Sequence, residues 1–206
     1  MQSGTLMISP NYSRNDYLDL VLEDPADWDR AIDIFNDRIG EQYFRQIRVL
    51  LMDDPRQNAF AAMALNCLLT EALLQFRDGL SDTGGKVAKL YERFIMEEFS
   101  DIFPNKYVAK KFYKGVRCGL LHGAQTNEDT CLTCDTENKA VFIADNRLFV
   151  SVPQYTGMLE DYYNRYVERL RSRSDPVLVD KFIRKMDYLC NGRGFNQERE
   201  RNGRWL

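Results

Sequence analysis

Histidine is almost absent from this chain: His122 is the only one among 206 residues. An imidazole moves protons near neutral pH, and acid–base reactions need one group to take a proton and another to give one. A single protomer can supply only one imidazole. Chemistry that needs two therefore requires a second copy of the chain.

The chain also lacks an excess of basic charge. Its 28 Lys and Arg residues face 31 Asp and Glu residues, so the formal net charge is −3. Such a balance gives no global field that would attract a polyanion. Any contact with a polyanion must therefore be local.

Long apolar runs and targeting signals are missing as well. No apolar stretch approaches the length of a membrane span, and the polar N-terminus lacks the basic start and apolar core of a signal peptide. We expect a soluble, cytoplasmic protein with no membrane partner.

The five cysteines, at positions 67, 118, 131, 134 and 190, are an odd number in a chain too long for a disulfide-stapled miniprotein. Reduced thiols are expected. The segment Cys131–Cys134 is half of a zinc-site pattern, and no second pair follows it. A metal site shared by two copies, a redox pair and an ordinary loop remain open for it, and we predict no metal.

Common cofactor motifs are absent too. The sequence contains no glycine-rich phosphate loop followed by Lys and Ser or Thr, no dinucleotide fingerprint and no serine-hydrolase elbow. We therefore expect no cofactor.

The length and the 44% hydrophobic content allow one good core. We predict a mobile N-terminal segment over residues 1–23, one helical domain over 24–192 and a loose polar tail over 193–206. Asp24-Pro25 has the acid and proline of a helix start. Helical periodicity then predicts six helices, near residues 24–53, 58–76, 87–99, 105–122, 158–170 and 175–191.

Between the fourth and fifth helices the apolar period changes to that of strands. Residues 140–144 and 147–152 flank Asp145-Asn146, a dipeptide that suits a tight turn. The predicted fold is thus all-α, a bundle of about six helices with an inserted two-stranded β-hairpin over about 140–152.

The fourth helix ends in the most informative motif, Arg117-Cys118-Gly119-Leu120-Leu121-His122. In an α-helix, five residues separate Arg117 and His122 by about 140° around the axis and about 7.5 Å along it. Arginine is long enough to reach around. A guanidinium neutralises phosphoryl oxygens, and an imidazole moves protons, so the pair suits metal-free phosphate chemistry.

This Arg-x-x-x-x-His spacing at the end of a late helix resembles the signature of the HEPN superfamily, whose helical domains are often metal-independent endoribonucleases. The resemblance extends from about Asp24 onward through the hairpin and final helices. It implies a composite site across a homodimer, with RNA as substrate, in a bacterial toxin or anti-phage setting with an antitoxin or other regulatory partner. Two positions depart from common forms: Cys118 replaces a polar residue, and Ala124 replaces a tyrosine found in one subgroup.

The reaction that such a site would serve is attack of a ribose 2′-hydroxyl on the adjacent phosphorus, which leaves a 2′,3′-cyclic phosphate. We predict that His122 transfers protons and that Arg117 positions the phosphate and stabilises the transition state. Two alternatives stay open. His122 and Arg117 are ordinary helix-end residues, or the chain is a non-catalytic HEPN-like scaffold that binds RNA or nucleotides or mediates dimerisation.

Other residues are secondary candidates. Glu71, within the most apolar helix, either pairs with an arginine or lines the site, and Cys118 either packs or takes part. Lys110, Lys111 and Lys114, with Lys106, form a basic stripe for RNA or a solvated helix face. The remaining candidates are aromatic residues that serve either as core or as a base-stacking platform: Phe112, Tyr113, Tyr162, Tyr163 and Tyr166.

Overall fold

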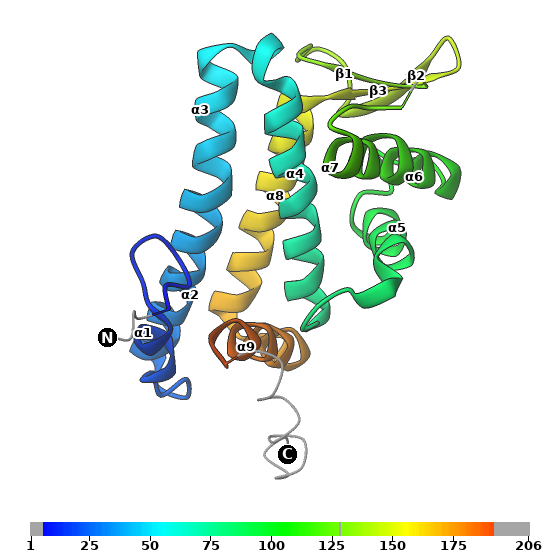
Figure 1. Cartoon of the computed structure of the whole chain (residues 1–206). Helices are drawn as coiled ribbons and strands as arrows, with labels where there is room; N and C mark the ends of the chain where they lie inside the picture. Colours follow the sequence, from blue (N-terminus) through cyan, green and yellow to red (C-terminus); the bar gives the residue numbers. More distant parts are fainter. Residues whose placement is uncertain (1–5, 128, 192–206) are drawn as a thin grey trace. The chain divides into compact units, whose positions relative to one another are not determined.

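The computed structural model describes residues 6–127 and 129–191. Over these residues the chain is mostly helical, with one small three-stranded sheet (Figure 1). Contacts divide the described chain into two compact units. Unit 1 comprises residues 6–42, 75–82 and 165–191, and unit 2 comprises the remainder. The expected tail over 193–206 lies outside the described residues.

The first predicted helix is present and contains a wider turn that the periodicity did not predict. It comprises α2 (Pro25–Ile39), the π-helical turn η1 (Gly40–Phe44) and α3 (Arg45–Asp53). Asp24 is the N-cap, as expected, because its carboxylate accepts hydrogen bonds from the backbone of Ala26 and Asp27.

Residues 6–23, which we expected to be mobile, are part of unit 1. They contain the short helix α1 (Arg14–Leu18), which Ser13 and Asp16 close with a reciprocal capping box. Asp37 on α2 anchors the segment that precedes α1. Its carboxylate accepts hydrogen bonds from the hydroxyl of Ser9 and from the backbone and side chain of Asn11.

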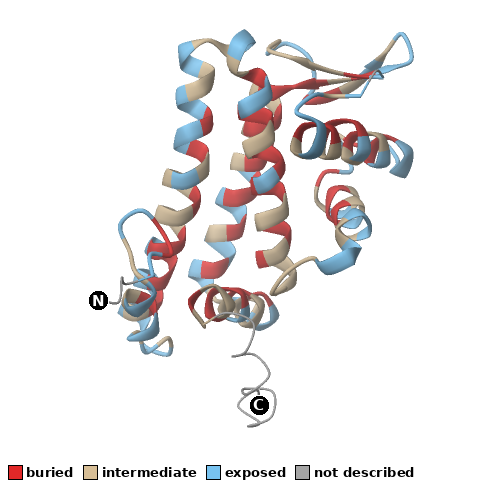
Figure 2. Ribbon diagram, in the orientation of Figure 1, coloured by how far each residue is buried: buried red, intermediate tan, exposed pale blue. Residues whose placement is uncertain are grey.

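The most apolar helix is α4 (Pro55–Asp78). By length and composition alone it could cross a membrane, which corrects the expectation that no stretch approaches that length. However, 56% of its most apolar window is buried inside the fold, and the core helix of a soluble protein has the same properties. We therefore describe α4 as a core helix of this fold (Figure 2).

The core of unit 1 is aromatic. Phe35 of α2 contacts Phe76, Tyr166 and Phe182, with ring centroids 4.5, 6.0 and 5.3 Å away. Tyr166 belongs to α8 (Val152–Ser172) and Phe182 to α9 (Pro176–Asn191). These contacts join segments that are far apart in sequence.

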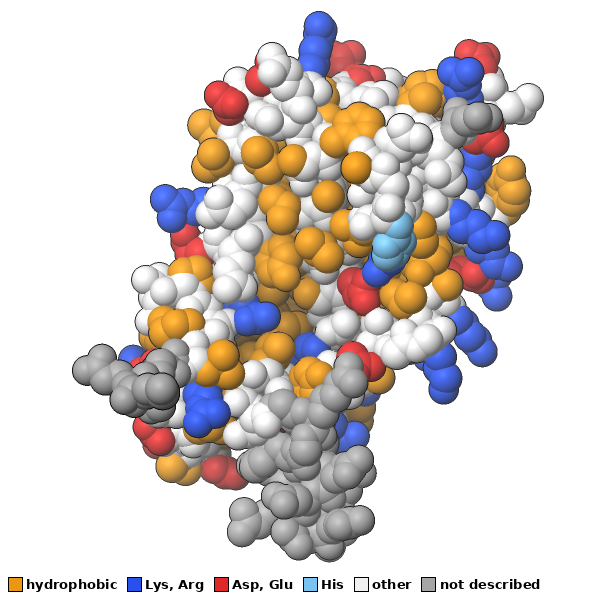
Figure 3. All heavy atoms as spheres, in the orientation of Figure 1, with side chains coloured by type: hydrophobic (Ala, Val, Ile, Leu, Met, Phe, Trp, Pro, Cys, Tyr) orange, Lys and Arg blue, Asp and Glu red, His pale blue; other side chains and the backbone are white. Residues whose placement is uncertain are grey.

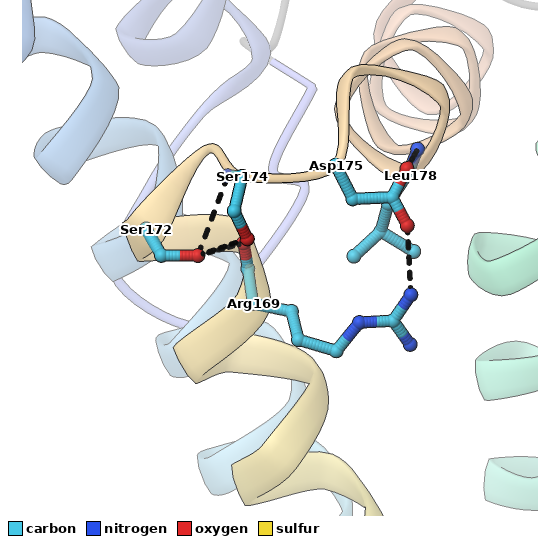
Figure 4. A network of polar contacts seen from close by, with 5 residues as sticks. All are labelled: Arg169, Ser172, Ser174, Asp175 and Leu178. Carbon is cyan, nitrogen blue, oxygen red and sulfur yellow. Dashed lines mark hydrogen bonds and ion pairs between the residues drawn. The ribbon is translucent and has the colours of Figure 1, made fainter.

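The turn from α8 to α9 is closed by polar contacts (Figure 4). Asp175 caps α9 by accepting a hydrogen bond from the backbone of Leu178, and its other oxygen pairs with Arg169 at 2.8 Å. The hydroxyls of Ser172 and Ser174 lie 2.8 Å apart. These hydrogen bonds and the ion pair lower the pKa of Asp175, so its carboxylate stays charged and the cap persists at mildly acidic pH.

In unit 2, α5 (Val87–Glu98) follows the 3₁₀ turn η2 (Gly84–Lys86). The predicted fourth helix consists of three parts: α6 (Lys106–Phe112), the π-helical turn η3 (Tyr113–Cys118) and α7 (Gly119–Gly123). The Arg-His motif thus begins in a π turn and ends in an α turn.

The sheet has three strands where we expected two. β2 (Val141–Ala144) pairs antiparallel with β3 (Arg147–Ser151) around Asp145 and Asn146, both at positive φ. The additional strand β1 (Thr130–Thr133) pairs in parallel with β3, so the order is β1-β3-β2. The sheet lies beside α6 and α7 in unit 2 (Figure 1).

The core of unit 2 is also rich in aromatic residues. Phe112 contacts Tyr91, Phe103 and Tyr155, with ring centroids 6.3, 5.3 and 5.1 Å away. Phe112, Tyr162 and Tyr163 are all buried, as is Tyr166 in unit 1. Of the aromatic residues considered as a base-stacking platform, these four are core residues.

Candidate functional site

The wide turn η3 is stabilised by the loop that follows the motif. The carbonyl of Gly115 accepts hydrogen bonds from the backbone of Asn127 and from the hydroxyl of Thr130, and the carbonyl of Lys114 accepts one from the Asn127 side chain. Gly115 permits this approach because a Cβ there would lie 2.4 Å from the Thr130 methyl group. Local π turns are rare and are often found at functional sites.

The end of α7 is equally tight. A Cβ on Gly119 would lie 2.5 Å from the carbonyl oxygen of Gln125, and the Gly119 carbonyl accepts the Gln125 backbone N–H. Ala124 closes the helix in the left-handed conformation, with φ at 55°. The chain therefore folds back directly after His122, which leaves that side chain exposed in the last turn.

Arg117 and His122 are in contact. The Nη1 of Arg117 lies 3.2 Å from the Nε2 of His122, so the long arginine side chain spans the angular separation expected from the sequence. A guanidinium can only donate, so Nε2 must accept. This contact requires a neutral imidazole with its proton on Nδ1. Figure 3 shows the histidine, in pale blue, at the surface beside charged and hydrophobic side chains.

Glu71 of α4 holds the other arm of the guanidinium. Its Oε2 lies 2.8 Å from Nη2 of Arg117, and its Oε1 accepts a hydrogen bond from the Thr83 hydroxyl at 2.8 Å. The two paired side chains are only 11% and 16% exposed, so this ion pair is shielded from water more than a surface pair is. The sequence left open whether Glu71 pairs with an arginine; it pairs with the arginine of the motif.

The surroundings of Arg117 keep its charge in place. Partial burial lowers its pKa, but the hydrogen bond and negative charge of Glu71 outweigh that effect and hold the pKa above its usual value. The Tyr113 ring lies beside the guanidinium, with its centroid 5.6 Å from Cζ. The buried Nε of Arg117 has no hydrogen-bond partner among the described residues.

Cys118 lies next to the pair and interacts with both Arg117 and Tyr113. Its thiol is partly accessible and free. Burial, together with the Cys118 thiol, raises the pKa of Tyr113, so the phenol stays protonated at neutral pH. On α4, burial raises the pKa of Cys67 to about 12, so that thiol is not an available nucleophile.

Only part of the predicted basic stripe of lysines is free to contact RNA. Lys110 and Lys114 are exposed, and Lys110 lies 3.8 Å from Glu92. Lys111 is different: it donates to the backbone carbonyl of Asn146 in the turn between β2 and β3. Lys110 and Lys114 are thus better placed than Lys111 to meet a phosphate backbone.

The pair Cys131 and Cys134 is not joined by a disulfide, and Cys134 donates to the carbonyl of Pro55. Among the described residues, no three His, Cys, Asp or Glu side chains are grouped closely enough to hold a metal ion. Cys131 lies in β1, and Cys134 directly follows that strand.

Two neighbours of the site were not identified from the sequence. Thr83 lies in a loop, and no pattern marks its contact with Glu71. Tyr113 was considered as core or as part of a stacking platform, whereas the structure places it beside Arg117. The periodicity of an apolar position does not distinguish a core aromatic from one at the edge of a site.

Comparisons with known proteins do not extend these observations, because no protein-family model, no curated protein and no solved structure matches this chain. The function must be argued from the site. Its parts are an exposed imidazole, a charged guanidinium in contact with it and a carboxylate that orients the guanidinium. This arrangement can bind an oxyanion and transfer a proton.

Proposed function

We propose that this protein is a metal-independent endoribonuclease that leaves a 2′,3′-cyclic phosphate. The observation that carries the proposal is the 3.2 Å contact between Arg117 and the exposed His122. It brings a permanent positive charge and a proton acceptor to one point on the surface, as attack at phosphorus requires. The resemblance of the motif to the HEPN superfamily supports the same activity, and a toxin or anti-phage setting with a regulatory partner.

The proposed reaction assigns one role to each group. When the phosphate binds, Nη1 of Arg117 turns from His122 to a non-bridging oxygen, and the freed, unprotonated Nε2 takes the 2′-hydroxyl proton while O2′ bonds to phosphorus. Arg117 holds the non-bridging oxygens and stabilises their added charge, and Glu71 positions Arg117. The bond from phosphorus to O5′ then breaks, and the leaving oxygen takes a proton from a second imidazole, that of another copy.

A surface on α4 supports the proposed homodimer. Phe60 and Leu68 are 44% and 42% exposed although both are large and apolar. On a helical projection they lie within about 80° of each other, with Ala64 and Glu71 between them. An apolar face beside the site is suited to a second copy, which would bring the second imidazole.

The test is RNA cleavage in excess chelator. We expect the wild-type protein to produce 5′-hydroxyl and 2′,3′-cyclic phosphate ends. His122→Ala should lose this activity, and Arg117→Lys should lose about 100-fold or more, because lysine cannot donate to both Glu71 and a phosphate from a planar fork. Arg48→Lys, at an exposed ion pair with Glu160 in the same unit, is the matched control and should retain activity. RNA left intact by the wild-type protein would refute the proposal.

Two observations favour a second candidate, a non-catalytic RNA- or nucleotide-binding scaffold. Glu71 neutralises Arg117, and Cys118 stands where a better hydrogen-bond former would assist the site. A scaffold predicts RNA binding that depends on Arg117 and Lys114, with no cleavage under any condition. The same assay, combined with a binding measurement, separates the two.

A further inference from the structure

The charge of the site can be counted from its contacts. Arg117 carries one positive charge and Glu71 one negative charge, and they are paired at 2.8 Å. His122 adds no charge in this contact, because only a neutral imidazole can accept a hydrogen bond from Arg117. The cluster of the three side chains therefore has no net charge in one copy, and two such clusters together have none.

Lys110 and Lys114 are exposed on the helical stretch that leads to the motif and attract the RNA backbone, but the three side chains that would contact the phosphate gain net positive charge only if one of them takes up a proton. The imidazole is the group suited to this, because its charge changes near neutral pH. Of the other titratable groups in the cluster, Glu71 of α4 is paired with Arg117, and the Tyr113 phenol of η3 keeps its proton because burial raises its pKa. Cys118, also from η3, can gain no positive charge, because a thiol can only lose a proton.

We infer that the site binds an internal phosphodiester of RNA with uptake of one proton per dimer, shared by the two His122 rings. The inference rests on the proposed function. One proton gives the two clusters a net charge of +1, which matches the single negative charge of an internal phosphodiester. A terminal phosphate carries nearly two negative charges at neutral pH and is matched less well. The same proton leaves one imidazole neutral and one charged, the base and the acid of the reaction.

Proton uptake by the imidazole can be measured directly, because the chain has a single histidine. The probe is a 2′-O-methyl tetranucleotide without terminal phosphates, which cannot be cleaved because it lacks the nucleophile. Titration calorimetry in two buffers with different heats of ionisation should show uptake approaching about one proton per dimer near neutral pH. The NMR titration midpoint of the imidazole should rise when the probe is bound, and no other histidine contributes a signal.

Substitutions sharpen the test. Glu71→Gln removes the negative charge, so the probe should bind this variant without proton uptake. At pH 8 its affinity for the variant should be about 3- to 10-fold higher than its affinity for the wild type. Glu160→Gln, in the exposed pair with Arg48, is the matched control and should behave as wild type. If Glu71→Gln does not fold, His122→Asn, at an exposed position, should abolish the uptake.

Two results would overturn the inference: the probe binds with the same heat in both buffers, or a nucleoside monophosphate binds more tightly than the tetranucleotide. Neither result affects cleavage of unmodified RNA, which tests the proposed function alone. Proton uptake on probe binding without any cleavage would instead remove the nuclease and leave a proton-coupled phosphodiester-binding site.

Discussion

The neighbours of Arg117 include a carboxylate, an imidazole and an aromatic ring. Only arginine can serve all three, because its planar fork donates in two directions while its face remains free for a ring. Glu71 orients this fork and keeps the guanidinium protonated. The negative charge of Glu71 also offsets the positive charge of Arg117. The catalytic potential of the site therefore depends on how a bound phosphate competes with Glu71.

Asp37 is the residue where a pH effect on stability is clearest. Partial burial raises its pKa, but hydrogen bonds from Ser9 and Asn11 outweigh this effect and lower the pKa below the usual value. A carboxylate whose pKa is lower in the folded state stabilises that state above the unfolded pKa of about 3.9, and this contribution is lost as pH falls through the folded pKa.

We therefore expect Asp37→Asn to lower the free energy of unfolding by about 1 kcal/mol or less at pH 7, and by progressively less as the pH falls below about 4. Urea denaturation across this pH range measures the difference. Asp33→Asn is the matched control, since Asp33 is on the same helix and its only described partner is Arg171, 3.6 Å away in an exposed pair. A difference between Asp37→Asn and wild type that stays constant from pH 7 to pH 2 would contradict the assignment.

At the scale of elements, the helix formed by α6, η3 and α7 depends on close contact with the loop after it. Gly115 and Gly119 have neighbours within 3 Å of an added Cβ, whereas Gly123 has none within 4 Å. The three glycines lie in one continuous helical stretch, so substitution by alanine compares packing at matched positions.

We expect Gly115→Ala and Gly119→Ala each to lower the free energy of unfolding by about 1–3 kcal/mol, because Thr130 or Gln125 must move. Gly123→Ala should be neutral or stabilising by up to about 1 kcal/mol, since alanine favours the helix. Thermal or chemical denaturation gives the comparison. Equal effects at all three sites would show that helix propensity, and not the loop contact, decides stability here.

The sequence predicted those elements whose signals are local. The six helices, the Asp24 cap and the turn at Asp145-Asn146 follow from periodicity, capping and turn chemistry. The strand β1 was missed because it pairs in parallel with β3, which is distant in sequence. Parallel strands are not joined by a tight turn, so the sequence has no turn motif that would indicate this pairing. The π turns were missed because they depend on contacts made by Asn127 and Thr130, outside the helix.

In the candidate site, too, local features could be predicted from the sequence and long-range contacts could not. Arg117 and His122 could be identified from their spacing, and Glu71 from being a carboxylate in an apolar helix. That Glu71 pairs with Arg117 could not be predicted, because 46 residues separate them and two helices must first pack. Thr83 and Tyr113 gave no signal of their part in the site.

At the scale of the whole molecule, the proposal requires two chains. We expect light scattering to give twice the chain mass of 24.1 kDa. Phe60→Glu with Leu68→Glu should convert the protein to a monomer and abolish cleavage, because charge on an apolar contact face opposes association. Met52→Glu on α3 is the control, since this large apolar side chain is 84% exposed yet lies on another helix. A double variant that remains dimeric and active would show that the second copy binds elsewhere.

The carbonyls of Lys114 and Gly115, turned toward the downstream loop, have one more consequence. A synthetic peptide that ends at Gly123 would contain the whole Arg-His motif but none of the donors that keep its widened turn open. It should relax to an ordinary helix, in which the guanidinium also lacks its carboxylate. Transplanting this chemistry to another scaffold would therefore require α4 and the segment through Thr130 as well, and short motif searches will find many sequences that lack this support.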